Sequence, residues 1–354
     1  MHTRTASLPA APDGLRYPIE TPPKPDEAIE VAPGLIWVRL TLPFRLNHVN
    51  IYLIADGDGW VMVDTGIGND STIAAWTTLL EGPLKGFKIT RLIVTHAHPD
   101  HVGLAGWIVE RFGCPLYMSQ VEYLQAAYHQ HRGSPERKLA QQLFFRRHGM
   151  DEEITEALLG KGQDYLTRVS VLPASYHRLS KGDDITIGNR IFKVITGGGH
   201  ALDQVMLFCE AEAIFLSADQ VLSKISPNVS VWAVEPEANS LGDYLASLTE
   251  LARTLPDDAL VLPGHGVPFY GVKTRITQLA DHHEERCQLI ADACRTSPKT
   301  SAELVPVVFH KHVLDAHQTG FAAGELIAHV NHMLAGGRLT SKLGSDDVLR
   351  FTAT

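Results

Sequence analysis

Three histidines and one aspartate fall within six consecutive residues of this chain, directly after the apolar run at 92–94. The four residues are His96, His98, Asp100 and His101. Imidazole nitrogens and carboxylate oxygens are the usual ligands of zinc and related divalent metals. Three histidines buried so close together without a metal would leave ring nitrogens unsatisfied, which is costly. The segment therefore predicts a metal site at the end of a short buried strand.

The bulk composition is typical of a globular protein with a large core. The chain has 354 residues, of which 44% are hydrophobic and 20% charged, so two domains are expected. The formal net charge of −9 disfavours nucleic acid or an anionic membrane as the main partner. No apolar run approaches the roughly 20 residues of a membrane span, and the N-terminus lacks an apolar signal core. The four cysteines form no CxxC pair, which indicates free thiols and a cytoplasmic location.

Changes of pattern divide the chain into three predicted parts. Residues 1–30 are rich in proline and are expected to form an extended arm. Residues 31–270 alternate strand and helix patterns, which suggests layered α/β or α+β packing. A helical insertion interrupts them at about 119–178. Residues 271–354 predict helices followed by two short strands, which suggests a winged-helix-like module.

Local signals place several helices. Residues 101–112 predict one helix ended by Gly113, and Ser119 and Glu122 fit a capping box at the start of the insertion. The aromatic side chains of the insertion are expected to pack between helices, with the lining of a substrate pocket as the alternative: Tyr123, Tyr128, Phe144, Phe145 and Tyr165. Other histidines are expected to be exposed to solvent, such as His129, His131, His282, His283, His310 and His312.

Further residues of ligand type stand where apparent strands end, next to glycine or another small residue. They are Asp64 in Val-Asp-Thr-Gly, His200 after three glycines, Asp219 in Ser-Ala-Asp, and His265 in Pro-Gly-His-Gly. A glycine beside a ligand allows the backbone to approach a crowded site closely. These positions add candidate ligands at the ends of further strands.

The order of these motifs resembles that of the metallo-β-lactamase-fold hydrolases. Asp-Thr-Gly, HxHxDH, His, Asp and His follow one another within residues 35–270, as in that superfamily. The resemblance implies an α+β fold, an αββα sandwich with metals at one edge of two facing sheets. The motif set is similar to the glyoxalase II, or hydroxyacylglutathione hydrolase, branch. The C-terminal segment resembles the small winged-helix domain appended to some members.

The same resemblance implies a dinuclear centre. One metal would be held by His96, His98 and His200, the second by Asp100, His101 and His265, with Asp219 bridging the two. Asp64 would orient the ligand loops through hydrogen bonds. Zinc is the expected ion, and iron and manganese accept the same ligands. A water shared by two ions about 3.5–4 Å apart becomes a hydroxide nucleophile near neutral pH, and Asp100 would hold and orient it.

The first substrate hypothesis is a small thioester or carboxylic ester whose carbonyl the metal-bridged hydroxide attacks. The basic glutathione-binding region of glyoxalase II is not recognisable in this chain. A coenzyme A thioester and a lactone therefore stay open as alternatives, as does a β-lactamase-like amide. The fold alone does not choose between them.

A metal-dependent nuclease or phosphodiesterase is the second hypothesis, because winged-helix modules often bind nucleic acid. Residues 271–354 hold nine Lys and Arg and nine Asp and Glu, so this segment has no net positive charge with which to attract phosphate. A non-enzymatic metal-binding or regulatory protein is a third hypothesis, but it predicts degenerate ligands, and none is seen. Formation of a homodimer is an alternative role for the tail.

Overall fold

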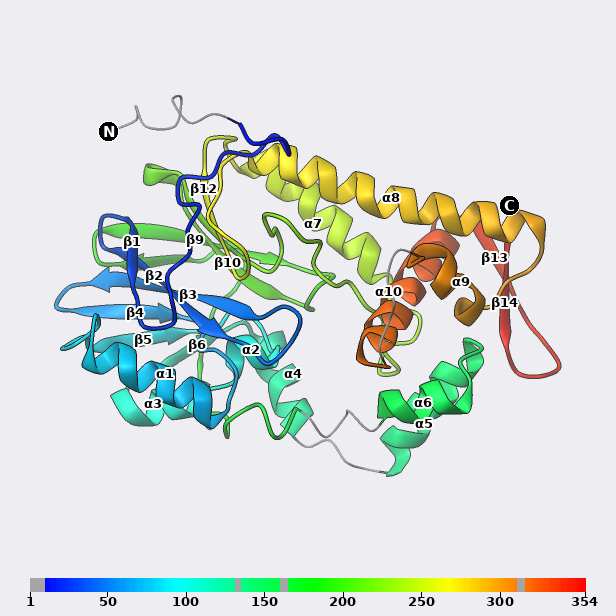
Figure 1. Cartoon of the computed structure of the whole chain (residues 1–354), viewed down its shortest axis with the longest axis horizontal. Helices are drawn as coiled ribbons and strands as arrows, with labels where there is room; N and C mark the ends of the chain where they lie inside the picture. Colours follow the sequence, from blue (N-terminus) through cyan, green and yellow to red (C-terminus); the bar gives the residue numbers. More distant parts are fainter. Residues whose placement is uncertain (1–9, 131–134, 160–164, 311–315) are drawn as a thin grey trace.

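The computed structural model describes residues 10–130, 135–159, 165–310 and 316–354. Two β-sheets face each other, and helices cover their outer faces (Figure 1). A smaller lobe built from the C-terminal helices and a β-hairpin lies beside this sandwich. The predicted α+β class is confirmed.

The first sheet has seven strands that follow chain order from one edge to the other. They are β1 (Ile29–Ala32), β2 (Leu35–Thr41), β3 (His48–Asp56), β4 (Gly59–Val63), β5 (Ile89–Ile93), β6 (Leu116–Met118) and β7 (His177–Arg178). Strands β1 to β4 pair antiparallel, whereas β4 to β7 pair parallel. Because β4 and β5 are parallel, their carboxyl ends open at the same edge of the sheet.

The second sheet has five strands in the order β12-β11-β10-β9-β8. They are β8 (Asp184–Ile187), β9 (Arg190–Gly197), β10 (Gln204–Cys209), β11 (Ile214–Ala218) and β12 (Leu260–Pro263). Strand β10 is antiparallel to both β9 and β11, and β11 is parallel to β12. Strands β9, β11 and β12 therefore run in the same direction and end at one edge.

Ten α-helices and a hairpin complete the described part of the chain. The helices are α1 (Asp70–Glu81), α2 (Pro99–Val102), α3 (Ala105–Phe112), α4 (Gln120–Gln130), α5 (Pro135–Arg147), α6 (Glu152–Leu159), α7 (Ser240–Thr254), α8 (Val272–Thr296), α9 (Ser301–Val308) and α10 (Ala316–Ala335). The hairpin consists of β13 (Leu339–Leu343) and β14 (Leu349–Ala353). None of these helices is long and apolar enough to cross a lipid bilayer.

The apolar side chains of β3 show how the sandwich is held together. Val49, Ile51 and Leu53 pack with α1 and α3 on the outer face of the first sheet. Tyr52 and Ile54 point the other way and pack against the second sheet. This alternation follows from the two-residue period of a strand, which sends successive side chains to opposite faces. Both faces of the strand are therefore buried.

The segment predicted as one helix over residues 101–112 is two helices, α2 and α3. The break lies at Gly103, where an added Cβ would come within 2.5 Å of the backbone of Pro99, Gly68 and Gly66. The backbone of the neighbouring loop occupies this space. Gly113 adopts φ 65° and ends α3, as predicted.

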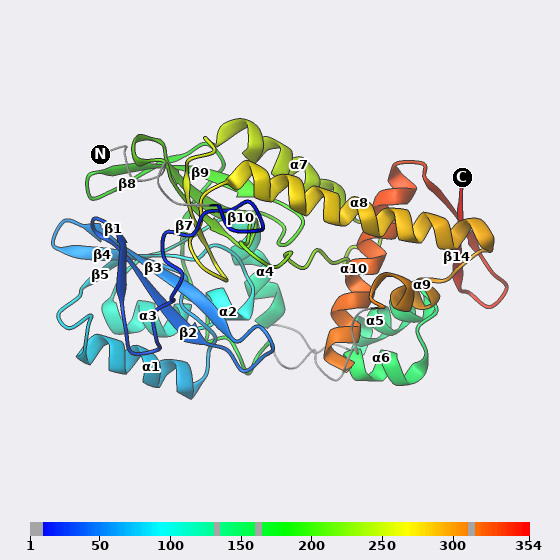
Figure 2. The ribbon, with the colours of Figure 1, turned by 45° about the horizontal axis from the view of Figure 1, so that its top comes forward.

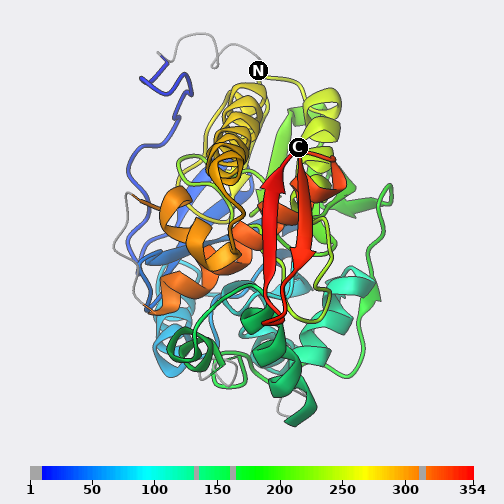
Figure 3. The same cartoon turned by 90° about the vertical axis from the view of Figure 1, so that its right-hand side faces the viewer.

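Helix α8 connects the sandwich to the C-terminal lobe (Figure 2). Helix α9 begins with a reciprocal capping box, in which the Thr300 hydroxyl accepts from Glu303 N and the Glu303 carboxylate accepts from Thr300 N. The β13–β14 hairpin lies at the far end of the lobe (Figure 3). Its Phe351 is 1% exposed and belongs to the same core as the helices.

Helices α5 and α6, which are distant in sequence from the tail, lie beside α9 and α10 (Figures 1 and 3). Phe144 and Phe145 of α5 are buried in one core with Leu304 and Leu326. Packing between helices is the role predicted for these aromatics. Part of the insertion is therefore built into the C-terminal lobe.

His148 makes the stability of this packing dependent on pH. Its Nδ1 lies 2.9 Å from Ser301 Oγ, so it connects the insertion to α9. Burial, assisted by the nearby charge of Arg147, lowers the pKa of His148 to about 4. The unfolded chain takes up this proton near pH 6.5, whereas the folded chain resists protonation until about pH 4. Stability from this group is therefore complete above pH 6.5 and is lost as the pH falls toward 4.

We expect His148→Gln to remove part of the acid sensitivity of the fold. Between pH 7 and pH 5 the wild type should lose about 1–2 kcal/mol more unfolding free energy than the variant. Urea titrations of both proteins at the two pH values measure this difference. Equal losses would show that His148 does not titrate with a depressed pKa.

Candidate metal centre

The candidate ligands stand at the carboxyl ends of strands from both sheets. His96 and His98 lie in the loop after β5, and α2 carries Asp100 and His101. In the second sheet, His200 follows β9, Asp219 follows β11 and His265 follows β12. Because these strands end at one edge of the sandwich, the fold brings all seven side chains together.

The first group consists of His96, His98 and His200. One ligand atom from each lies within 4.8 Å of the others. His96 Nε2 is only 2.9 Å from His98 Nδ1. The group can therefore present three imidazoles to a single ion, the kind of set that zinc accepts.

The second group consists of Asp100, His101 and His265. Its ligand atoms also lie within 4.8 Å of one another. The Oδ2 atom of Asp100 is 3.4 Å from His265 Nε2 and 3.8 Å from His101 Nε2. This group adds a carboxylate to two imidazoles.

Asp219 lies between the two groups. Its Oδ2 atom is 3.3 Å from His200 Nε2, 3.2 Å from His265 Nε2 and 3.5 Å from His101 Nε2. Gly264 leaves room for this carboxylate, since an added Cβ would come within 2.2 Å of Asp219 Oδ1. Asp219 therefore lies within 3.5 Å of ring nitrogens from both groups.

Three buried atoms of these groups have no hydrogen-bond partner among the described residues. They are His101 Nε2, His200 Nε2 and Asp219 Oδ1. A buried donor or acceptor without a partner costs about 1–3 kcal/mol. A divalent cation would satisfy these atoms, so the residues present fit a metal centre.

Protonation differs between the two groups in the metal-free chain. Burial alone would lower the pKa of His265, but the carboxylates of Asp219 and Asp100 outweigh burial and raise this pKa to about 10. Burial lowers the pKa of His98 to about 3, and the neighbouring His200 adds to the effect. A metal ion bound by His265 must therefore displace a proton, and acid should weaken metal binding.

Asp64 orients the second group from behind. Its carboxylate accepts hydrogen bonds from Thr95 N at 2.8 Å and from Thr95 Oγ1 at 2.9 Å. The other ring nitrogen of His101, Nδ1, lies 2.8 Å from Asp64 Oδ2. Asp64 has φ 66°, a left-handed conformation that aspartate tolerates better than most residues. A proton on Nδ1 leaves Nε2 of His101 free to bind a metal.

Two backbone carbonyls orient further imidazoles, and no sequence motif identifies them. His265 Nδ1 lies 2.6 Å from His48 O, and His200 Nδ1 lies 2.8 Å from Asn228 O. Each contact places the ring proton on Nδ1 and directs Nε2 toward Asp219.

Glu122 contacts the centre in a way that the sequence did not reveal. The carboxylate accepts from Ala97 N and from Asp203 N, both at 2.8 Å. Ser119 Oγ accepts from Glu122 N, which is half of the predicted capping box. The other half of the predicted capping box, in which the Glu122 carboxylate accepts from Ser119 N, is wrong. This carboxylate turns toward the ligand loops instead. The sequence offered one signal for this role: Glu122 is an acidic residue in the first turn of a helix that follows the HxHxDH motif.

A separate buried group of ligand type lies between α8 and α10. It contains His283, Glu325 and His329, and His283 Nδ1 is 3.1 Å from His329 Nε2. Arg286 already forms an ion pair with Glu325. A divalent ion would add uncompensated positive charge to this buried cluster, so the geometry favours a structural polar network.

The exposure predicted for the remaining histidines is only partly correct. His283 is fully buried, so its prediction is wrong, because α10 covers this face of α8. His310 is exposed, and His129 and His282 are half-buried. His131 and His312 lie outside the described residues.

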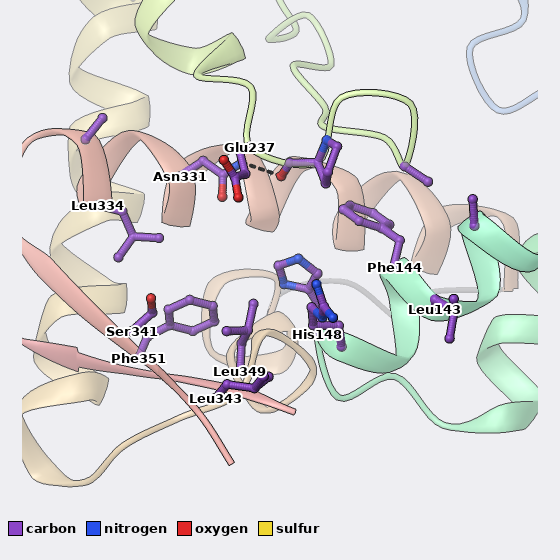
Figure 4. A pocket seen from close by; sticks show the side chains of 15 residues that line it. Leu143, Phe144, His148, Glu237, Asn331, Leu334, Ser341, Leu343, Leu349 and Phe351 are labelled. Atoms are coloured by element: carbon purple, nitrogen blue, oxygen red, sulfur yellow. Dashed lines mark hydrogen bonds between the residues drawn. The ribbon is translucent and has the colours of Figure 1, made fainter. Parts of the chain in front are cut away.

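A cavity of about 690 Å³ lies in the C-terminal lobe, between α5, α10 and the β13–β14 hairpin (Figure 4). Leu143, Phe144, Leu334 and Phe351 give it an apolar wall, and His148 also lines it. No candidate metal ligand lines this cavity. The cavity is therefore distinct from the site formed at the strand ends.

Comparison with protein families gives two matches along the chain. The family described as "Metallo-beta-lactamase superfamily" matches residues 45–265, which include all seven candidate ligands. The family described as "Metallo-beta-lactamase-like, C-terminal domain" matches residues 287–354.

Solved structures and curated relatives agree with these matches. A beta-lactamase domain protein from Burkholderia ambifaria is 39% identical, with a TM-score of 0.88 over 96% of this chain and 98% of that chain. A metallo-beta-lactamase family protein from Thermus thermophilus is 27% identical, with a TM-score of 0.77 over 92% of this chain and 100% of that chain. The "Probable metallo-hydrolase YqjP" of Bacillus subtilis is 24% identical over 87% of this chain and 94% of its own length. A hydroxyacylglutathione hydrolase of Bradyrhizobium is 24% identical over 63% of this chain and 68% of its own length.

Proposed function

Since the chain belongs to the metallo-beta-lactamase superfamily and carries the C-terminal domain of such proteins, we propose that it is a dinuclear metal-dependent hydrolase of a thioester or carboxylic ester. One observation carries the proposal. Seven ligand-type side chains converge in two groups around the carboxylate of Asp219, and three of their buried atoms lack a hydrogen-bond partner among the described residues. His96, His98 and His200 would hold one ion, and Asp100, His101 and His265 the other.

Divalent ions bound there would lower the pKa of a shared water toward 7 and polarise the carbonyl of the substrate. The carboxylate of Asp100 is the candidate catalytic group, because its side chain is 20% exposed while that of Asp219 is 6% exposed. Asp100 would accept a hydrogen bond from the attacking water and orient it toward the carbonyl. Asp64 and the carbonyl oxygens of His48 and Asn228 hold the imidazoles in their ligating orientation.

An acyl substrate is favoured over a phosphodiester by charge and by one relative. The C-terminal segment has balanced charge, and the whole chain is acidic, which disfavours a substrate recognised through its phosphate groups. The Bradyrhizobium relative is named for hydrolysis of a glutathione thioester. This resemblance supports a thioester, while coenzyme A thioesters, lactones and β-lactams stay within the range of the chemistry.

A metal analysis combined with a substrate panel tests the proposal. We expect purified full-length protein to hold about two divalent ions per chain, and zinc is the ion we propose. Values of kcat/KM are measured for thioesters, lactones, β-lactams and phosphodiesters, and the thioesters or carboxylic esters should give the highest. A clear preference for phosphodiesters or β-lactams would overturn the substrate class. Protein that binds no metal would overturn the whole proposal.

A further inference from the structure

The inserted helix α4 reaches into the metal centre through Glu122. This side chain is 1% exposed, and its two carboxylate oxygens have different partners. Oε2 accepts from Ala97 N and Oε1 accepts from Asp203 N, each at 2.8 Å. One buried carboxylate therefore connects two separate loops.

The two loops are those that supply the first group of ligands. Ala97 stands between His96 and His98, after a strand of the first sheet. Asp203 is three residues beyond His200, before a strand of the second sheet. Glu122 is therefore a connection across the sandwich at the place where three imidazoles must converge on one ion.

Glu122 is a buried carboxyl group without a basic partner among the described residues, which is unusual for a purely structural residue. Burial raises the pKa of this carboxyl, and the two backbone donors lower it only in part. Among the described residues, no lysine or arginine forms an ion pair with Glu122. The carboxylate contacts Ala97, next to His96 and His98, and Asp203, three residues after His200. A negative charge at this place would stabilise a cation held by these histidines.

We propose that Glu122 is a positioning residue that sets the metal affinity of the His96–His98–His200 group; this inference rests on the proposed function. Two effects act together. The carboxylate fixes the spacing of the two ligand loops, and its negative charge offsets part of the charge of the bound ion. Hydrogen-bond partners behind metal ligands typically contribute about 10–100-fold to metal affinity.

Tyr165, near the other end of the insertion, supports the same loop. Its hydroxyl donates to Ala97 O at 2.9 Å. The peptide groups of Ala97 are therefore held on one side by Glu122 and on the other by Tyr165. Both ends of the insertion act on the segment between His96 and His98.

Glu122→Gln and Ser119→Ala form a matched pair of variants. Glutamine keeps the shape but replaces one acceptor oxygen with an amide NH₂, which cannot accept from Ala97 N or Asp203 N. Ser119→Ala removes only the helix cap, at a cost of about 1 kcal/mol in stability. Both changes lie at the start of α4, and only the first alters the contacts with the ligand loops.

Metal affinity of full-length protein is measured by zinc competition with a chromophoric chelator, with circular dichroism to verify folding. We expect Glu122→Gln to weaken one of the two zinc sites by about 10–100-fold and to leave the other within about threefold. Ser119→Ala should lower the melting temperature and leave both affinities unchanged. Excess zinc should restore most of the kcat/KM of Glu122→Gln.

Three outcomes would overturn the inference: unchanged zinc affinities in folded Glu122→Gln, equal weakening of both sites, or the same weakening in Ser119→Ala. If Glu122→Gln does not fold, Tyr165→Phe provides the test, because it removes only the hydroxyl that holds Ala97 O. A several-fold loss at the same single site is then expected, and no loss would overturn the inference. Wild-type protein that binds no zinc would instead refute the proposed function.

Discussion

Asp219→Asn is expected to lower kcat/KM by at least about a thousandfold and to reduce the bound metal to one ion per chain or fewer. The Oδ2 atom of Asp219 lies within 3.5 Å of a ring nitrogen of His200, His265 and His101, so both groups depend on it. Asparagine preserves the shape but removes the negative charge. A bound ion stabilises the charge that develops in the transition state by several kcal/mol. Each step of about 1.4 kcal/mol in activation free energy changes the rate tenfold.

The measurement combines metal analysis with kcat/KM on the best ester or thioester of the panel. Asp184→Asn is the control, because it makes the same charge change at an exposed position at the start of β8. The control should retain wild-type metal content and activity. Asp219→Asn that keeps two ions and more than a tenth of the activity would show that Asp219 is not a shared ligand.

The strand-end residues could be predicted from the sequence because each lies in a short local pattern. The HxHxDH motif follows an apolar run, and His200, Asp219 and His265 each follow another apolar segment beside glycine or alanine. Such patterns identify ligand chemistry without knowledge of the fold. Their convergence depends on strand direction, which the order of motifs indicated only through the resemblance to a known superfamily.

Apart from Asp64, the groups that orient the ligands could not be predicted in this way. His48 and Asn228 act through backbone carbonyls, which every residue possesses. Glu122 matched a local capping box, and the tertiary contacts with Ala97 and Asp203 replaced half of that local interaction. His283 was expected in solvent, and its neighbours in the sequence are polar. Its burial depends on α10, which is about 45 residues away in the chain.

The place of the insertion in the fold depends on similar long-range packing. Its first helix, α4, contacts the metal loops through Glu122, whereas α5 and α6 pack in the C-terminal lobe. Hydrophobic periodicity identifies an amphipathic helix but not the surface that it covers. The insertion is thus connected to both parts of the molecule.

Asp64 allows a second prediction of large effect. Two substitutions separate the role of its carboxylate charge from that of its left-handed backbone conformation. Asp64→Asn retains a side chain that tolerates φ 66° and can still accept from Thr95 N. Its NH₂ group then faces Thr95 Oγ1 and His101 Nδ1, where an acceptor is needed. The His101 proton is expected to move to Nε2, which blocks metal binding by that atom. We expect the second ion to bind about 10–100-fold more weakly, with little change in the first.

Asp64→Ala should in contrast destabilise the fold as well. It leaves the buried donors Thr95 N and Thr95 Oγ1 without their acceptor, at about 1–3 kcal/mol for each unsatisfied group, and places alanine in a left-handed conformation. Urea unfolding in the presence of chelator isolates this effect from metal loss, and zinc competition measures the sites. If the two variants lose the same metal affinity and the same stability, Asp64 acts only as a structural residue. Selective loss of one ion in a stable Asp64→Asn protein would show that the carboxylate sets the ligating form of His101.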